Sequence, residues 1–378
     1  MAGKLFQILN NDLQKAVDVD DLGGRSVPVN MNWAEEGFLT KDTGYIPFGS
    51  VPNAEAHSHF FYKKKDGSFY FIRALNTKLQ KYSYADREWY DIDSSPTFTA
   101  GARFGYDVYN NNLYFGNSVE SLYKWDGATF TEFVSAPKGN ILEVYEDRLF
   151  VSGVTAEPLS VYYSNVGNPE VFSVADVVKP LGNDFCTGLV NYYGVMLIFK
   201  QKTIWKLSFV YDQTVTLFVP KLELQSGNYG ACSRRAYAWV ENDIWFFTGT
   251  EVRSIGYKDQ QIGVLGVNTS VISDHIKVAL AALPVANQGN VVCFYNNRRF
   301  YLGLGLSSAT NDTMYVCHTL YGNSWTKYTG RDKARAGDAV VVDGIIYSSA
   351  QSSPYGTIKW TVETADTLTQ NAHLTTEN

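Results

Sequence analysis

The hydrophobic pattern of this 378-residue chain is one of short apolar strands separated by polar turns. Residues 102–133 show the unit most clearly, with four strand-like runs and two tight turns, one around Asn110 and Asn111 and one at Asp126 and Gly127. Asp-Gly and clustered Asn supply the positive φ angles of tight hairpins, and aromatic and β-branched residues favour strands. The stretch therefore predicts a four-stranded antiparallel meander.

The aromatic-rich second strand of this unit recurs along the chain at intervals of 36 to 56 residues, a loose period in the range of propeller blades. Its seven occurrences are centred on Tyr70, Tyr114, Phe150, Ile198, Trp245, Tyr301 and Tyr347. One such unit cannot bury both faces of its sheet, so the units must stack radially and close. We predict an all-β fold, a β-propeller of about seven four-stranded blades. An ordinary β-sandwich pair, without a true repeat, is the alternative.

The repeat divides the chain into an extended N-terminal arm (1–50), a propeller (51–365) and a C-terminal tail (366–378). The arm is rich in Asn, Asp and Gly and lacks periodicity. We expect its best strand candidate, residues 37–40, to pair with residues 357–361 and so close the ring from both chain ends. Residues 1–32 are then expected to serve assembly rather than folding. Candidate assembly residues in this segment are Phe6, Leu13, Asp20 and Asp21.

One segment departs from the strand pattern. Between residues 270 and 284 the apolar spacing becomes helical, and Ile276, Leu280 and Leu283 fall on one face. Ser273 or Asp274 could cap such a helix, and Pro284 would stop it. We predict one short helical insertion near residues 271–283.

Five tryptophans fall at predicted strand positions and are expected to fill the wedges between blades. They are Trp125, Trp205, Trp245, Trp325 and Trp360. The Asp126–Gly127 pair that follows the first of them is interpreted as a structural turn.

Charge and hydropathy limit the possible partners. The net charge of −6 argues against a general nucleic-acid-binding surface, so weak duplex binding without sequence preference is expected. The basic pairs Arg234–Arg235 and Arg298–Arg299 are interpreted as solvated hairpin ends. No apolar run reaches membrane-spanning length and the N-terminus lacks a signal-peptide pattern. Neither membrane insertion nor secretion is therefore expected.

Signatures of catalysis, cofactor binding and metal binding are missing from the sequence, which contains no GxSxG, P-loop, HExxH or strand-linked GxGxxG motif. His57 and His59 share one face of a strand, but no third metal ligand is evident. Four widely spaced cysteines are expected to be free, buried thiols. We predict no catalytic, cofactor or metal site.

Several segments in the middle of the chain together resemble the propeller of the tail nozzle and packaged-DNA stabilisation proteins of short-tailed phages. The resemblance covers about residues 140–277 and continues more weakly to Trp360. The segments, in order, are residues 148–153, 161–165, 167–172, 197–207, 243–249, 252–256 and 271–277. Compared with that family, this chain has a short N-terminal arm and ends soon after its last blade.

The resemblance implies a structural protein of the virion tail, assembled in the host cytoplasm. Copies would form a homo-oligomeric ring beyond the portal and adaptor proteins, continue the DNA channel and help to retain the packaged genome. A secreted or surface propeller that binds or hydrolyses glycans is the alternative, which an arginine-lined pocket would favour. An intracellular WD-type scaffold is a third possibility, but the single Trp125–Asp126 pair does not make the repeat that such a fold requires.

Overall fold

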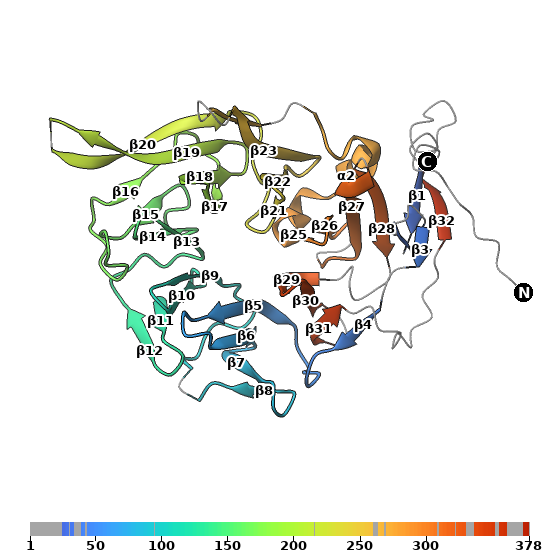
Figure 1. Cartoon of the computed structure of the whole chain (residues 1–378), viewed down its shortest axis with the longest axis horizontal. Coiled ribbons are helices and arrows are strands. Elements are labelled where there is room, and N and C mark those ends of the chain that lie inside the picture. The colour runs from blue at the N-terminus through green and yellow to red at the C-terminus, as the bar shows by residue number, and fades with distance from the viewer. Residues whose placement is uncertain are drawn as a thin grey trace, which may run out of the picture.

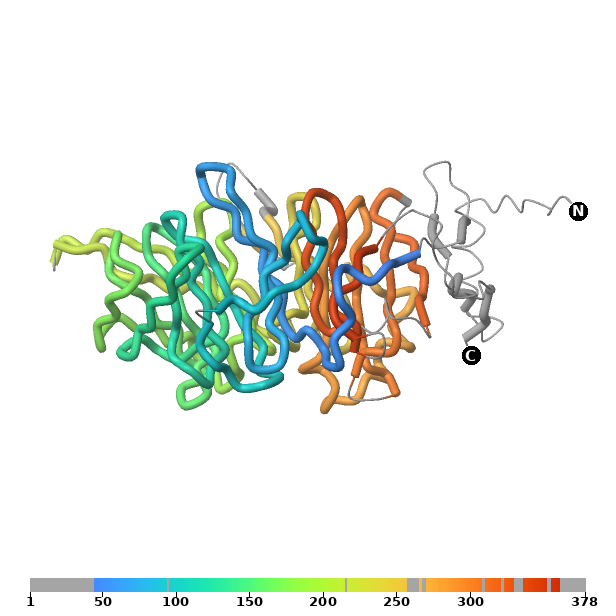
Figure 2. The backbone as a smooth tube through the Cα atoms, turned by 90° about the horizontal axis from the view of Figure 1, so that it is seen from below, coloured from blue at the N-terminus to red at the C-terminus, as the bar shows by residue number. Residues whose placement is uncertain are grey.

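The chain forms a β-propeller of seven blades, arranged around a central axis (Figure 1) as a disk when seen from the side (Figure 2). The computed structural model describes residues 25–29, 31–33, 39–41, 44–93, 95–214, 216–259, 264–267, 270–307, 310–321, 323–329, 336–351, 355–360 and 373–377. Within these residues each blade contains four antiparallel strands. The predicted fold class is confirmed.

The first four blades follow one another along the chain. Blade 1 contains β5 (Ala56–Lys63), β6 (Phe69–Leu75), β7 (Lys78–Ser83) and β8 (Glu88–Asp91). Blade 2 contains β9 (Gly105–Tyr109), β10 (Asn112–Gly116), β11 (Leu122–Trp125) and β12 (Phe130–Phe133). Blade 3 contains β13 (Ile141–Tyr145), β14 (Arg148–Ser152), β15 (Val161–Tyr163) and β16 (Val177–Val178). Blade 4 contains β17 (Cys186–Tyr192), β18 (Val195–Lys200), β19 (Ile204–Asp212) and β20 (Leu217–Ser226).

Of the last three blades, blades 6 and 7 include strands from the chain ends. Blade 5 contains β21 (Tyr237–Val240), β22 (Asp243–Phe247), β23 (Val252–Asp259) and β24 (Val264–Val267). Blade 6 contains β25 (Val292–Asn296), β26 (Arg299–Leu304), β27 (Thr313–His318) and β28 (Ser324–Thr329), and β1 (Arg25–Val29) and β32 (His373–Glu377) extend its sheet. Blade 7 contains β29 (Ala336–Val342), β30 (Ile345–Ala350), β31 (Gly356–Trp360) and β4 (Tyr45–Pro47). A separate hairpin joins β2 (Met31–Trp33) to β3 (Leu39–Lys41).

The seven aromatic-rich clusters of the sequence lie in the second strand of each blade, from β6 to β30. These strands are buried along almost their whole length, as the pattern of β18, with five buried residues after Val195, illustrates. A second strand has partners on both edges and neighbouring blades against both faces, so both of its faces must be apolar. This burial explains why the clusters read as continuous hydrophobic runs rather than as alternating patterns.

The hydrophobic core is divided among the interfaces between neighbouring blades. Trp125 illustrates the packing: it is 1% exposed and contacts the rings of Tyr62, Tyr70 and Phe130 at centroid distances of 5.0–5.7 Å. Comparable clusters join each blade to the next, including blade 7 to blade 1 through Tyr347 and Phe71. The ring is thus held by continuous apolar contact around the axis.

Closure of the ring uses a different segment from the one predicted. The outer strand of blade 7 is β4, in which Tyr45 pairs with Trp360 and Pro47 with Ile358. Of the predicted segment 37–40, the described residues Leu39 and Thr40 lie in β3 and pair with β2 instead. The ends of the chain do close the propeller, but the closing strand lies nearer to blade 1 than expected. Phe48 directly follows β4 and stacks on Tyr82 of blade 1, with the two ring centroids 4.0 Å apart.

The predicted helical insertion is present between blades 5 and 6. It consists of η2 (Asp274–Ile276), α2 (Lys277–Ala281) and η3 (Val285–Asn290), and η4 (Thr319–Tyr321) lies within blade 6. Ser273 does not cap the helix as expected, since its hydroxyl accepts a hydrogen bond from the Val252 amide at 2.8 Å. No helix in the described part of the chain is long and apolar enough to cross a membrane.

Candidate functional site

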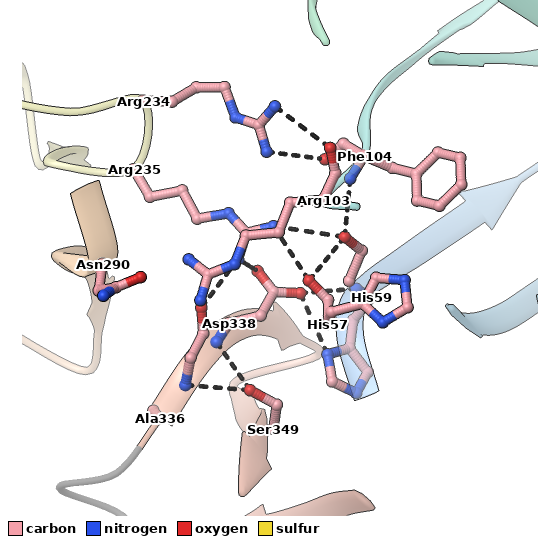
Figure 3. Close-up of polar contacts among 12 residues, drawn as sticks. His57, His59, Arg103, Phe104, Arg234, Arg235, Asn290, Ala336, Asp338 and Ser349 are labelled. Carbon is pink, nitrogen blue, oxygen red and sulfur yellow. Dashed lines mark hydrogen bonds and ion pairs between the residues drawn. The ribbon is translucent and has the colours of Figure 1, made fainter. Parts of the chain in front are cut away.

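The candidate site lies at the propeller axis, where the first strands of the blades begin (Figure 1), and Figure 3 shows its polar contacts. The loop before β21 in blade 5 brings Arg234 and Arg235 into contact with blades on other sides of the axis. We call these two residues, with Arg103, His59 and Asp338, the axial cluster. It connects segments of the chain that are far apart in sequence.

Arg235 reaches blades 7 and 1. Its guanidinium donates to the Gly337 carbonyl at 2.8 Å and lies 3.0 Å from an Asp338 carboxylate oxygen. The other Asp338 oxygen accepts from the His59 amide at 2.6 Å and lies 3.1 Å from the His59 ring Nδ1. The remaining ring nitrogen of His59 contacts the Thr357 hydroxyl at 3.0 Å, so both ring nitrogens are used within the protein.

Arg234 reaches blades 2 and 3, and its partners are backbone carbonyls. It donates to the Asn140 carbonyl at 2.8 Å, to the Arg103 carbonyl at 3.3 Å and to the Phe104 carbonyl at 3.5 Å. No carboxylate lies within ion-pair distance of Arg234 or Arg103 among the residues that the structure describes. These contacts hold the guanidinium group of Arg234 in place, but the carbonyl groups are neutral and do not cancel its positive charge.

Three of the first strands are irregular where they reach the site. Register shifts leave His57 as an extra residue in β5, Thr187 in β17, and Gly337 and Asp338 in β29. A β-bulge re-aims side chains and breaks regular pairing, and bulges gather next to functional sites. The irregularities therefore place these residues at the axis rather than in the sheets.

Burial and the charges of the arginines shift the pKa values of several residues of the axial cluster and of His57. Burial, followed by the charge of Arg235, lowers the pKa of His57 to about 4 and that of Arg103 to about 10. Burial and the neighbouring arginines lower the pKa of Arg234 to about 9. Burial alone would raise the pKa of Asp338, but Arg235 and His59 outweigh it and hold that pKa at about 2. Asp338 is therefore an anion at neutral pH.

A cavity of about 260 Å³ opens beside the axial cluster. Arg103, Arg234 and Arg235 line it, together with Asn140 and Thr187. The Thr187 side-chain oxygen is buried and has no hydrogen-bond partner among the described residues. The cavity thus combines three guanidinium groups with an unsatisfied hydroxyl.

The solvated role expected for Arg234 and Arg235 is wrong. Their positions in the repeat held the signal, since they precede the first strand of a blade, at the axis, whereas Arg298 lies in the turn between the first and second strands and Arg299 begins the second. Arg298 is exposed, as expected of a hairpin end. Long-range contacts to carbonyl groups leave no trace in local sequence.

A second group of titratable residues lies on neighbouring first strands, Asp107 on β9 and Glu143 on β13. Burial, followed by the charge of Asp107, raises the pKa of Glu143, and burial raises that of Asp107. Backbone amides still stabilise both carboxyl groups, from Val108 to Asp107 at 2.7 Å and from Asn191 to Glu143 at 2.9 Å. The pair therefore favours a state that keeps a proton at pH values where exposed carboxylates are ionised.

This pair predicts a measurable pH dependence of stability. The folded protein holds a proton that the unfolded chain releases near the ordinary glutamate pKa of 4.5. Its stabilising contribution is complete below that value and is lost as the pH rises through the higher pKa of the folded state. Glu143→Gln should remove this loss, so the stability of the wild type relative to the variant should fall by up to about 1.4 kcal/mol per pH unit above pH 5.

Urea denaturation of both proteins between pH 5 and pH 8 measures the effect. The exposed Glu132→Gln variant is the control and should keep the wild-type pH profile. Parallel profiles for the wild type and Glu143→Gln would contradict the protonation of the pair.

The tryptophans singled out in the sequence all lie in strands and are buried, with 1–9% of their surface exposed. They occupy β11, β19, β22, β28 and β31. Gly127 adopts a φ of +99°, and Asp126 accepts hydrogen bonds from the amides of Ala128 and Thr129 at 2.8 and 2.7 Å. These residues shape the blades and none of them lines the axial cavity.

The other sequence expectations have mixed outcomes. All four cysteines are free and buried, as predicted. The candidate assembly residues Phe6, Leu13, Asp20 and Asp21 lie outside the described residues. No group of three potential metal ligands occurs in the part of the chain that the structure describes.

A projecting hairpin at the rim of the disk is the second candidate site, and it was not predicted from the sequence. Strands β19 and β20 extend well beyond the rest of blade 4 (Figures 1 and 2). Near its tip Tyr211 and Phe218 pair across the strands with ring centroids 5.5 Å apart, and both are more than half exposed. Val210 and Leu217 beside them are also exposed. Exposed apolar side chains gathered on a projecting ribbon are typical of a docking element.

No family model matches the chain, and no curated protein matches it. Solved structures with a similar fold include a streptogramin B lyase, with a TM-score of 0.53 at 9% identity, over 84% of this chain and 97% of that one. Virginiamycin B lyase from Staphylococcus aureus is similar with a TM-score of 0.51 at 6% identity, over 80% and 94% of the chains. A chain of the mitotic checkpoint complex has a TM-score of 0.54 at 9% identity, over 86% and 93%. At these identities the similarity establishes the propeller fold alone.

Proposed function

We propose that this protein is a structural component of a phage tail. Copies form a ring that continues the DNA channel beyond the portal and adaptor, and the ring helps to retain the packaged genome. The protein performs no catalysis in this role. The resemblance of the middle of the chain to tail nozzle proteins supports this function, and the propeller fold is compatible with it.

The observation that carries the proposal is the exposed apolar tip of the β19–β20 hairpin. An isolated two-stranded ribbon is only marginally stable in water, and apolar groups on it gain free energy when they are covered. One projecting element needs a single complementary surface elsewhere on the same chain to build a head-to-tail contact, which closes into a ring if the rotation fits. We assign a second copy of this chain as the partner of the hairpin.

The path of DNA follows from the axial cluster. Side chains of Arg234 and Arg235 bridge blades across the axis of each propeller. A duplex therefore passes between copies, through the centre of the ring, and not through a single propeller. The net charge of −6 suits a channel that does not hold phosphate groups tightly.

Native mass spectrometry and negative-stain imaging of the full chain test this function. We expect rings of copies for the wild type and monomers for a Leu217→Ser/Phe218→Ser variant, because the variant loses the apolar contact while its core is unchanged. Val174→Ser is the control, since Val174 is 98% exposed but lies in blade 3, away from the hairpin tip. A wild type that stays monomeric at all concentrations, or a hairpin variant that still forms rings, would contradict the proposal.

One observation favours a second candidate function, a propeller that binds or hydrolyses anionic glycans. The three arginines around the axial cavity form the arginine-lined pocket that this function requires. A screen with neutral and acidic glycosides distinguishes the two. Turnover of an acidic glycoside would support the glycan function and would replace the structural one.

A further inference from the structure

The charges around the axial cavity do not balance. Three guanidinium groups line it, those of Arg103, Arg234 and Arg235. Asp338 is engaged by Arg235 and His59, as described above. Glu55 is the other acid whose charge acts on Arg103, and burial raises its pKa, which disfavours its ionised form. The region therefore carries an excess of positive charge.

Burying excess charge away from water raises the free energy of the folded protein unless a counter-ion or hydrogen bonds compensate the charge. Among the described residues, Arg234 donates hydrogen bonds only to neutral carbonyl groups. Two of these bonds use Nη1 and one uses Nη2, while a guanidinium has five N–H donors. The Nε–H and one Nη2–H remain, and together they form the fork that binds two oxygens of a carboxylate or phosphate.

The cavity also contains a second donor that the fold leaves unused. Thr187 is the bulge residue of β17, its hydroxyl is buried, and no described residue is its hydrogen-bond partner. Thr187 and Arg234 both line the cavity, although they come from different blades. A volume of about 260 Å³ accommodates a small anion with several waters, since one water takes about 30 Å³ in the liquid.

We propose that this cavity binds a small oxyanion, a carboxylate or a phosphate, which pairs with Arg234 and Arg103 and accepts a hydrogen bond from Thr187. The anion neutralises the excess charge and joins blades 2, 4 and 5 at the axis. Anion binding does not depend on ring assembly, so an experiment can contradict the anion site without contradicting the structural function proposed above, and the reverse is also true.

Calorimetric titration of the full chain in chloride buffer of constant ionic strength tests the site. One series uses inorganic phosphate and a second uses glucuronate, so that a free phosphate and a sugar carboxylate are distinguished, and glucose is the neutral control. We expect saturable binding of at least one anion and none of glucose. The same anion should raise the melting temperature with increasing concentration, because it binds the folded state.

Three variants locate the binding. Thr187→Val keeps the shape of the side chain and removes a hydroxyl without a partner in the protein, so it should fold normally and bind the anion about tenfold more weakly. Arg234→Gln should abolish binding, and Arg298→Gln, on an exposed hairpin, should bind like the wild type.

Two results would overturn the site. The first is the absence of saturable binding of phosphate and of glucuronate to the wild type. The second is an affinity that is unchanged in Thr187→Val, which would place any bound anion elsewhere. The Thr187→Val result decides the matter even if Arg234→Gln fails to fold.

Discussion

Replacing Trp125 by alanine is expected to lower the free energy of unfolding by about 3–5 kcal/mol. The indole is 1% exposed and lies between blades 1 and 2, enclosed by Tyr62, Tyr70 and Phe130. Removal of the ring takes away its transfer free energy and leaves a cavity that the surrounding strands cannot fill. Urea denaturation followed by circular dichroism measures the change.

Two further variants show whether packing is the cause. Trp125→Phe should lose much less stability, because it keeps an aromatic ring and removes an indole N–H that has no hydrogen-bond partner among the described residues. Trp239→Ala should also cost less, because Trp239 is 40% exposed, although it stacks on Tyr192 at 5.1 Å. A Trp125→Ala protein as stable as Trp239→Ala would show that the interface between blades 1 and 2 is not tightly packed.

Replacing Arg235 by methionine should have a similarly large effect, about 3–5 kcal/mol. Asp338 would remain as a buried anion without its cation, and the carbonyl of Gly337 would lose its donor at 2.8 Å. The same substitution at the exposed Arg298 should change stability by less than about 0.5 kcal/mol.

A double-mutant cycle separates the ion pair from the rest of the loop. In Arg235→Met/Asp338→Leu neither charge remains, so the double variant should be more stable than the sum of the two single losses implies. Strictly additive losses would mean that Arg235 acts through its carbonyl contacts rather than through Asp338.

The fold could be predicted from sequence because its determinants are local. Asn110, Asn111 and Gly127 adopt the positive φ angles that their turns require, at 46°, 64° and 99°. The second strands are buried along almost their whole length, and each contains a continuous hydrophobic run that marks its blade. Repetition then fixes the architecture, since each blade must cover its neighbours.

The candidate sites could not be predicted because their determinants are not local. Arg234 and Asn140 are in contact although they lie in different blades, and the acceptor is a backbone carbonyl that any residue could supply. The bulges that contain Thr187 and Asp338 depend on the register between neighbouring strands, β17 with β18 and β29 with β30. The closing strand was misplaced for a related reason: Tyr45–Pro47 is short, and its role depends on a partner at the other end of the chain.

The same closing strand sets the order in which the protein can be completed during synthesis. Blades 1 to 5 are each built from strands that follow one another, so each can form soon after it leaves the ribosome. Blade 7 combines β4, made before all the strands of blades 1 to 5, with β31, made after them. β4 therefore has no partner strand until β31 is synthesised, after nearly the whole propeller has been translated. A nascent chain that stops before Gly356 leaves β4 as an open edge, which makes premature termination a direct route to aggregation.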